Sequence, residues 1–357
     1  MPDTRWIQLT IAEDFRPVYG GRGARARVPL ISPAFSEEDA DRLASDVRSI
    51  AISGMLTNGP FVRELEAKAQ DYLGVKRCVA VSNCTAGLML VLRASDLSGD
   101  VIVPSFTFAA TAHAVAWNGL RPVWADVDPE TLTLDAAKTE KAVGARTSAI
   151  LATHLYGTPC DTEGLEEVAR RHGIKLFFDA AHAFGSIHDG RKTGGFGDAE
   201  VFSLSPTKVM VAAEGGIIAT NDEVLAERLV IGRDYANPGD YDCRFVGLNA
   251  RMSELHAAVA LRSFENLEDN IETRNASADK YREALAHVPG ISFPVVPDGD
   301  RSTFKDFTIL VEPDEYGMTA GDLAATLAAE GIETRRYYYP PVHKMRAYAS
   351  VKSSTGL

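Results

Sequence analysis

The sequence predicts an α/β protein in which helices cover both faces of a large, mostly parallel β-sheet, followed by a smaller C-terminal α+β domain. Between residues 61 and 222, short β-rich runs alternate with segments of helical hydrophobic period. Several of these runs are continuously apolar, which is typical of strands buried on both faces of a parallel sheet. After Gly247 the alternation stops, and a long segment without Gly or Pro precedes a short strand and a helix.

The elements of the large domain, expected over residues 29–250, follow residues 1–28, whose Arg and Gly content from Arg16 to Arg27 predicts an N-terminal arm. Amphipathic helices are expected at 61–73 and 85–95. Strands are expected at 78–82, 101–105, 121–127, 148–154, 175–180, 199–204 and 215–222. In such sheets, ligands bind at the carboxyl ends of the strands.

Residues 251–357 are expected to form a long helix and a small domain. From Arg251 to Val288 the apolar spacing indicates one long helix or two in succession, ended by Pro289 and Gly290. An alternating strand at 302–312 and a helix at about 320–330 follow. Because the chain then ends in "VKSSTGL" without a closing strand or helix, the small domain is expected to be incomplete at its C-terminus.

The composition excludes several classes of partner. A net charge of −12 argues against nucleic acid or an acidic membrane as the main partner, because phosphate recognition needs a basic surface. The four cysteines show no CxxC pair and no metal-ligand spacing, so reduced thiols and no metal site are expected. The start lacks the features of a signal peptide, and no run of about 18 apolar residues occurs, which predicts a cytoplasmic protein.

Lys208 is the first candidate for chemistry, in "SLSPTKVMVAAEGG". A lysine that follows a strand has two interpretations, a surface residue on a turn or a desolvated amine that is neutral and nucleophilic enough to form a Schiff base. Asp179 ends the apolar run "KLFF", where a carboxylate is costly unless it meets a cation such as a protonated pyridine nitrogen. Residues 82–85 join a strand to a helix start, which can bind phosphate, and Ser203 adds a hydroxyl. These residues occur in the order that a pyridoxal phosphate site needs.

Eight segments resemble the DegT/DnrJ/EryC1/StrS family of pyridoxal-phosphate-dependent sugar aminotransferases, and the likeness runs from about Pro29 onward. The segments are "SNCTAGL", "VIVPSFTFAATAHAV", "PVWADVDPETLTLD", "THLYGTPCD", "FFDAAHAFGS", "FSLSPTK", "AEGGIIATND" and "GLNARMSELHAAVAL". The resemblance implies fold type I, the aspartate-aminotransferase-like fold.

The resemblance also implies roles for single residues. Lys208 corresponds to the lysine that forms the Schiff base and moves the proton, and Asp179 to the partner of the pyridine nitrogen. Phe108, after "PSFT", corresponds to the aromatic residue that stacks on the cofactor ring, with a core Phe as the alternative. His182 corresponds to a contact near the ring hydroxyl, although a histidine beside an apolar strand is otherwise more often structural.

The phosphate ligands implied by the resemblance are Thr85, Ala86 and Ser203. Asn249 in "GLNARM" corresponds to a residue that the neighbouring subunit lends to the phosphate, so a homodimer with shared active sites is expected. Cys84 stands where Gly is usual in the phosphate turn; it would be strained if that position needed a positive φ, and otherwise it places a thiol near the cofactor.

The resemblance implies transfer of an amino group from an amino acid, expected to be glutamate, to a keto sugar on a nucleoside diphosphate, with pyridoxamine phosphate as the intermediate form of the cofactor. A dTDP-4-keto-6-deoxyhexose is the favoured acceptor, for an antibiotic or glycan amino sugar. A 3-keto sugar, a cyclitol ketone and a non-catalytic cofactor-binding regulatory protein are the alternatives. A cysteine desulfurase-like lyase would need Cys243 as its nucleophile.

Cations for the diphosphate are expected among Arg251, Arg335, Arg336 and the arginines from Arg16 to Arg27, each of which is otherwise a solvated surface residue. The segment from Tyr337 to His343 resembles the segment that lines the sugar site in the family.

Overall fold

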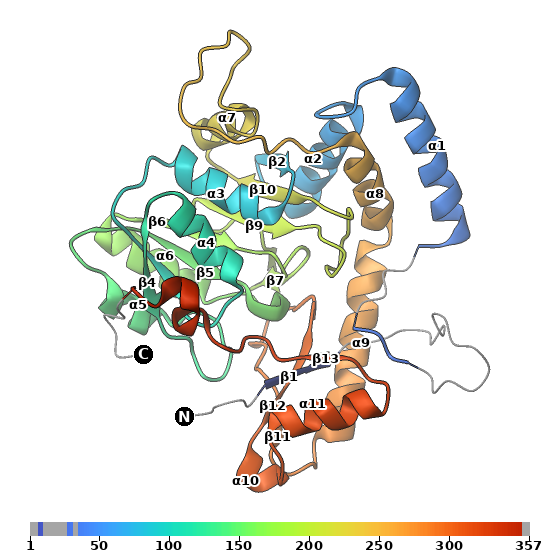
Figure 1. Cartoon of the computed structure of the whole chain (residues 1–357), viewed down its shortest axis with the longest axis vertical. Helices are drawn as coiled ribbons and strands as arrows, with labels where there is room; N and C mark the ends of the chain where they lie inside the picture. The colour runs from blue at the N-terminus through green and yellow to red at the C-terminus, as the bar shows by residue number, and fades with distance from the viewer. Residues whose placement is uncertain (1–5, 10–26, 31–34, 352–357) are drawn as a thin grey trace.

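The large sheet is the centre of the molecule. The computed structural model describes residues 6–9, 27–30 and 35–351. In these residues a seven-stranded sheet has the order β2-β10-β9-β6-β5-β3-β4 (Figure 1). Its strands are β2 (Arg77–Val81), β3 (Asp100–Pro104), β4 (Arg121–Ala125), β5 (Thr147–Thr153), β6 (Lys175–Asp179), β9 (Ala199–Ser203) and β10 (Gly216–Thr220). Strand β10 runs antiparallel to both of its neighbours, and the other six strands share one direction. The predicted strands and the mostly parallel sheet are therefore confirmed.

Helices cover both faces of this sheet. They are α2 (Pro60–Leu73), α3 (Cys84–Ala94), α4 (Ala109–Trp117), α5 (Ala136–Ala142), α6 (Thr162–His172), α7 (Glu223–Gly232) and α8 (Glu254–Glu265). The neighbouring side chains Phe177 and Phe178 of β6 point to opposite faces. Phe177 lies in an apolar cluster with α3, α4 and α7, whereas Phe178 packs with α6. The strand is thus buried on both faces, which explains its continuous apolar run.

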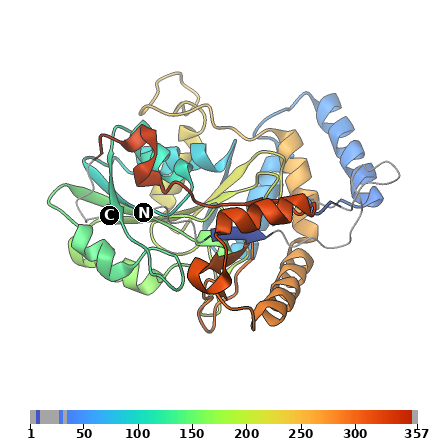
Figure 2. The ribbon, with the colours of Figure 1, turned by 60° about the horizontal axis from the view of Figure 1, so that its bottom comes forward.

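A smaller antiparallel sheet forms the second unit. Its order is β11-β12-β1-β13, and its strands are β1 (Trp6–Leu9), β11 (Ile291–Ser292), β12 (Phe307–Val311) and β13 (Thr334–Arg335). The helices α9 (Leu267–Leu285), α10 (Pro313–Tyr316) and α11 (Ala320–Ala329) accompany it. Figure 2, which brings this unit forward, shows α11 lying against β1 and β13. Strand β1 belongs to the expected N-terminal arm and was not predicted.

Two further differences from the sequence-based expectations concern the C-terminal part. The predicted strand at 302–312 begins only at Phe307, because the chain bends at Phe304, whose φ is +41°. The last described residues of the chain do not pack against the small sheet. Val342 and Tyr348, in the short turns η2 (Val342–Lys344) and η3 (Arg346–Tyr348), are buried in the apolar cluster of the large sheet.

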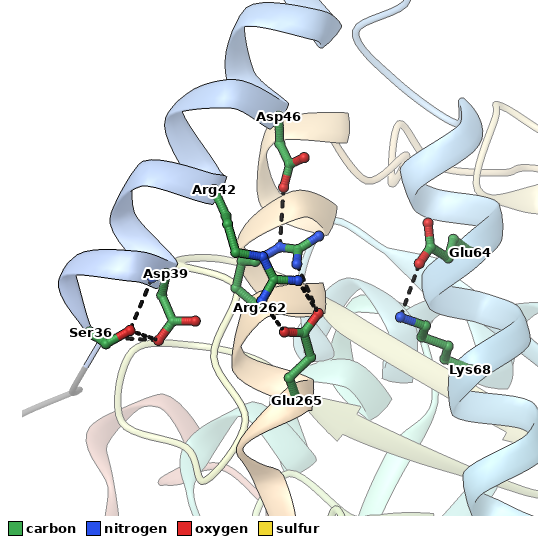
Figure 3. Close-up of polar contacts among 8 residues, drawn as sticks. All are labelled: Ser36, Asp39, Arg42, Asp46, Glu64, Lys68, Arg262 and Glu265. Carbon is green, nitrogen blue, oxygen red and sulfur yellow. Dashed lines mark hydrogen bonds and ion pairs between the residues drawn. The ribbon is translucent and has the colours of Figure 1, made fainter.

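The predicted helical bridge between the units consists of two helices in succession, α8 and α9, which meet at Asn266. Helix α1 (Glu37–Ser53) packs against α8 and lies at the margin of the molecule (Figure 1). Figure 3 shows the ion pairs that hold it there. Arg42 pairs with Glu265 at 2.7 Å and Asp46 with Arg262 at 3.1 Å.

No helix among the described residues is both long and apolar enough to cross a membrane.

Candidate active site

The candidate residues gather where the strands of the large sheet end. Asp179 is the last residue of β6 and pairs with Val201 of β9 and Thr153 of β5. Ser203, the last residue of β9, lies opposite Gly216, which in turn lies opposite Val81 at the end of β2. Helix α3 begins three residues after Val81. The carboxylate, the hydroxyl and the helix start therefore share one edge of the sheet, as parallel strands require.

Lys208 reaches this edge from the loop after β9, where its backbone N–H donates to Ser205 in a turn. The side chain is partly buried, and within the described part of the chain its amine has no hydrogen bond and no ion pair. Burial lowers the pKa of Lys208 to about 8, and the positive charge of Lys305 acts in the same direction. A substantial fraction of the amine is therefore neutral near pH 8, as a nucleophile and proton carrier requires.

Asp179 is buried and held in place by two donors. Thr111 of α4 donates its hydroxyl to Asp179 Oδ2 at 2.7 Å, and the backbone N–H of Ala181 donates to Oδ1 at 3.2 Å. Burial raises the pKa of this carboxyl, and the Thr111 hydrogen bond opposes the rise. A cation placed opposite Asp179 would stabilise its ionised form further.

A chain of threonine hydroxyls lies behind Asp179. Thr107 lies 2.9 Å from Thr111 and 3.0 Å from Thr153, oxygen to oxygen. Thr107 lies in the β3–α4 connection, Thr111 in α4 and Thr153 at the end of β5, and β5 is distant from the other two in the sequence. None of these three threonines was predicted from the sequence, although Thr107 and Thr111 lie within "PSFTFAAT".

The start of α3 provides donors for an anion. Asn83 caps the helix, and its side chain accepts a hydrogen bond from the backbone N–H of Ala86 at 2.8 Å. The N–H and the hydroxyl of Thr85 have no partner among the described residues. Of the two predicted ligands on α3, Thr85 therefore has free donors, whereas the N–H of Ala86 is already used.

Cys84 is the first residue of α3 and its φ is not positive, so the substitution of Gly by Cys causes no backbone strain. Its thiol is buried and lies 3.9 Å from Asp179 Oδ1. Burial raises the pKa of Cys84 well above its usual value, so the thiol stays protonated. Gly216 is required beside it, because a Cβ on this residue would lie 2.8 Å from the backbone N of Cys84.

Phe108 caps α4, three residues before Thr111, and its side chain is 55% exposed. This exposure contradicts a core Phe, the alternative considered above, and leaves the ring free to cover a ligand. Its ring centroid lies 6.3 Å from that of Tyr338. Tyr338 is buried and was not predicted individually.

His182 is buried three residues after Asp179. The backbone N–H of Tyr156 donates to His182 Nδ1 at 3.1 Å, so this nitrogen carries no proton. Burial lowers the pKa of His182 well below its usual value, and the charges of Lys208 and Lys305 add to this effect. The neutral ring therefore presents Nε2–H as a donor.

The remaining candidates make other contacts. Asn249 is exposed and forms an isolated backbone bridge with Asp234. Arg251 pairs with the side chain of Asp234. Arg335 donates to the hydroxyl of Tyr337 at 2.6 Å, and Arg336 lies over the ring of Tyr339 at 4.9 Å.

In the N-terminal arm, Arg27 pairs with Glu333. The other expected arginines, from Arg16 to Arg25, lie outside the described residues.

One further cluster could hold a metal ion. Ligand atoms of Glu163, His188 and Asp189 lie within 4.8 Å of one another. However, His188 already has both ring nitrogens bonded, Nε2 to Glu163 at 2.9 Å and Nδ1 to Asp300 at 2.8 Å. These contacts suit an ion-paired histidine, and the two carboxylates raise its pKa against the effect of burial.

The residues present fit pyridoxal phosphate. The cofactor brings a cationic pyridine nitrogen, an aldehyde and a phosphate. The buried Asp179 carboxylate suits the nitrogen, and the unpaired amine of Lys208 suits the aldehyde. The free donors of Thr85 at a helix start suit the phosphate.

The chain is similar to known sugar aminotransferases. The sequence model of the DegT/DnrJ/EryC1/StrS aminotransferase family matches residues 37–356. The chain is 36% identical over 295 residues to dTDP-4-amino-4,6-dideoxy-D-glucose transaminase of Shigella dysenteriae, covering 82% of this chain and 80% of that protein. It is 35% identical over 333 residues to dTDP-3-amino-3,4,6-trideoxy-alpha-D-glucose transaminase of Streptomyces venezuelae, covering 92% of this chain and 86% of that one.

The fold has solved counterparts. The structure of DesI in the presence of its TDP-sugar product superposes with a TM-score of 0.85 at 38% identity. The superposition covers 88% of this chain and 81% of that chain. The expected aspartate-aminotransferase-like architecture is thereby confirmed.

Proposed function

Because the chain belongs to the DegT/DnrJ/EryC1/StrS aminotransferase family, we propose that it transfers an amino group from an amino acid to a keto sugar carried on a nucleoside diphosphate. The chain is a sugar aminotransferase, and the family's cofactor is pyridoxal phosphate. The observation that carries the proposal is the unpaired amine of Lys208 at the same sheet edge as the buried carboxylate of Asp179.

Pyridoxal phosphate, when bound, would supply an aldehyde that takes up the amino group and a ring that delocalises the electron pair left on carbon when a proton is removed. Asp179 would accept a hydrogen bond from the protonated ring nitrogen. Thr111 keeps this carboxylate oriented. Thr85 and Ser203 would bind the phosphate, and Phe108 would cover one face of the ring.

Lys208 Nζ would carry the proton between the reacting carbon of the substrate and the carbon of the cofactor that receives it. Because the pKa of this amine is about 8, it can accept and return a proton near neutral pH at little cost. His182 Nε2–H would donate to the ring hydroxyl without adding a charge. The partly buried position of Lys208 limits access of water to the proton in transfer.

The favoured acceptor is a dTDP-4-keto-6-deoxyhexose and the favoured donor is glutamate. The relative from Shigella dysenteriae supports a 4-amino product by its name, and the one from Streptomyces venezuelae keeps a 3-keto acceptor open. A cyclitol ketone also remains an alternative. An amino sugar for an antibiotic or a surface glycan is the proposed product, made by a homodimer in which Asn249 completes the neighbouring site.

The test uses purified protein loaded with pyridoxal phosphate, glutamate and a panel of nucleoside diphosphate 4-keto and 3-keto sugars. Mass spectrometry is expected to detect the amino sugar with at least one acceptor, and none with Lys208→Ala. Absence of product from every sugar would contradict the proposal.

A non-catalytic regulatory protein would give a different spectrum. If the bound cofactor kept its absorbance after addition of every amino acid tried, the protein would bind cofactor without turnover.

A further inference from the structure

A second lysine is buried near the candidate active site. Lys305 and its neighbour Asp306 precede β12 and have side chains only 6% and 9% exposed. The Lys305 amine lies 2.7 Å from Asp306 Oδ1 and 2.8 Å from Oδ2. Burying two charges is expensive, so an ion pair at this depth calls for an explanation beyond stability.

The backbone places this pair against the wall of the site. The N–H of Lys305 donates to the carbonyl of Tyr156 at 2.9 Å, and Tyr156 in turn donates to His182. Thr303 donates its hydroxyl to the carbonyl of His182 at 2.6 Å. The bend at Phe304, after which the strand begins, turns Lys305 toward the large domain. The small domain thus contributes this residue to the site.

Lys305 is a cation among acids. Among the described residues, the charge of Lys305 lowers the pKa of Lys208, whereas Asp306 and Asp179 raise it, so Lys305 lies within electrostatic range of Lys208. An ammonium group has three N–H donors. Among the described residues Asp306 is the hydrogen-bond acceptor for Lys305, and Lys305 Nζ also lies 5.6 Å from the ring centroid of Tyr337. A single carboxylate at these two distances leaves at least one N–H without a hydrogen-bond acceptor among the described residues.

The two substrates carry their negative charge at different distances from the reacting carbon. In an amino acid the carboxylate is bonded directly to the carbon that bears the amine. In a nucleoside diphosphate keto sugar the diphosphate is attached to C1, and the ketone lies at C3 or C4, across the ring. A cation close to Lys208 therefore faces the carboxylate of the donor and not the diphosphate of the acceptor.

We propose that Lys305 binds the α-carboxylate of the amino-acid donor and so contributes to donor affinity without contributing to nucleotide-sugar affinity. This assignment rests on the proposed function, because it requires an amino-acid donor. Asp306 holds the ammonium group in position and compensates part of its charge, so that the site is not left with an uncompensated cation when the neutral sugar ring replaces the donor.

The test is Lys305→Met in the cofactor-loaded protein, with Lys192→Met as the matched control. Lys192 lies over the ring of Tyr72, outside the site. The probe is α-methyl-L-glutamate, which can bind but has no α-proton to lose, and its affinity is followed by the change in cofactor absorbance. Loss of a charged hydrogen bond is expected to weaken its binding about tenfold or more. The affinity for the nucleotide sugar is expected to stay within about twofold.

A second variant guards against misfolding. Lys305→Met leaves Asp306 buried without its partner, so Lys305→Met/Asp306→Asn is measured alongside it and is expected to show the same selective loss. Unchanged binding of α-methyl-L-glutamate in this double variant, or an equal loss for both substrates, would overturn the assignment of Lys305. If the wild-type protein takes an amino group from no amino acid, the proposed function itself fails, which is a distinguishable result.

Discussion

Lys208 and Asp179 lie at one edge of the sheet, and burial moves their pKa values in opposite directions. For Lys208 burial favours the neutral amine, and for Asp179 it favours the neutral acid. Both groups are thereby less charged than they would be in water. A cofactor with a cationic nitrogen restores the charge of Asp179, while Lys208 remains available for proton transfer.

Replacement of Lys208 by Met is expected to stabilise the cofactor-free protein at pH 7. The pKa of Lys208 is lower in the folded chain than in the unfolded one, so the unfolded chain binds more protons and the wild type loses stability as pH falls toward 8. Below that pH the loss is complete and amounts to about 3 kcal/mol. Urea unfolding from pH 6 to pH 9.5 measures the free energy of unfolding of both proteins. The advantage of the variant over the wild type should shrink above pH 8, and an advantage independent of pH would contradict this prediction.

Replacement of Thr111 by Val is expected to impair catalysis through Asp179. The variant removes the hydroxyl that lowers the pKa of Asp179, so the carboxyl ionises at higher pH. We expect kcat at pH 7 to fall about tenfold and the acidic limb of the pH profile to move upward.

Thr111→Ser, which keeps the hydroxyl, should retain the wild-type profile. A Thr111→Val profile identical to that of the wild type would show that this hydrogen bond does not influence the reaction.

At the scale of single residues, the sequence predicted the candidate site residues whose position follows from a local pattern. Lys208 follows a strand, and Asp179 ends one, so both positions could be assigned before the fold was known. Thr111 and Lys305 could not be assigned, because their contacts join segments that are distant in the sequence. A buried ion pair between neighbouring residues, as in Lys305 and Asp306, has no signal in hydrophobic periodicity.

The hairpin formed by β7 (Ile187–His188) and β8 (Arg191–Lys192) is attached to two other segments through one side chain. His188 bonds Glu163 at the start of α6 and Asp300 in the loop before β12. These acids raise its pKa, so the stabilisation is complete below the unfolded pKa of about 6.5 and is lost as pH rises through the higher folded value.

We therefore expect the free energy of unfolding to decline above neutral pH in the wild type. In His188→Gln the amide can keep one hydrogen bond but does not titrate, so this decline should be smaller. Denaturant unfolding of both proteins between pH 5.5 and pH 8.5 measures how far the free energy of unfolding declines in each. Parallel curves for the two proteins would exclude a role for His188 in the pH dependence.

At the scale of elements, the seven strands of the large sheet were predictable because each is a short apolar run bounded by polar or glycine residues. The sequence could not show where the expected strand at 302–312 begins. The bend at Phe304 depends on the hydrogen bond of Thr303 with His182, a contact with the other domain. The break between α8 and α9 at Asn266 was left open for a similar reason, since neither Gly nor Pro marks it.

The whole molecule exposes surface that a second copy could cover. Several apolar side chains around α1 and α8 are exposed: Ile52 (69%), Met55 (48%), Leu56 (55%) and Leu255 (41%). Asn249 is exposed as well. Both features suit the proposed homodimer with shared sites.

A mixture of two inactive variants tests this arrangement. On its own, the Lys208→Ala variant is expected to be inactive. The Asn249→Ala variant is expected to keep only a small part of the wild-type activity. In a mixed dimer, one site receives an intact Lys208 and an intact Asn249. Co-expression at equal levels should therefore restore about a quarter of the wild-type activity, because half the dimers are mixed and each has one good site. Activity no higher than that of Asn249→Ala alone would contradict shared sites.

Strand β1 has a consequence for how the molecule is made. Its residues pair with Phe307–Leu310 on one side and with Thr334 and Arg335 on the other, across about 300 positions of the chain. A ribosome therefore releases β1 long before the strands that pair with it. During that interval β1 remains an unpaired strand. A fusion placed at the amino terminus would be held close to β12 and β13, and it should slow the final step of folding more than one placed at the carboxyl terminus.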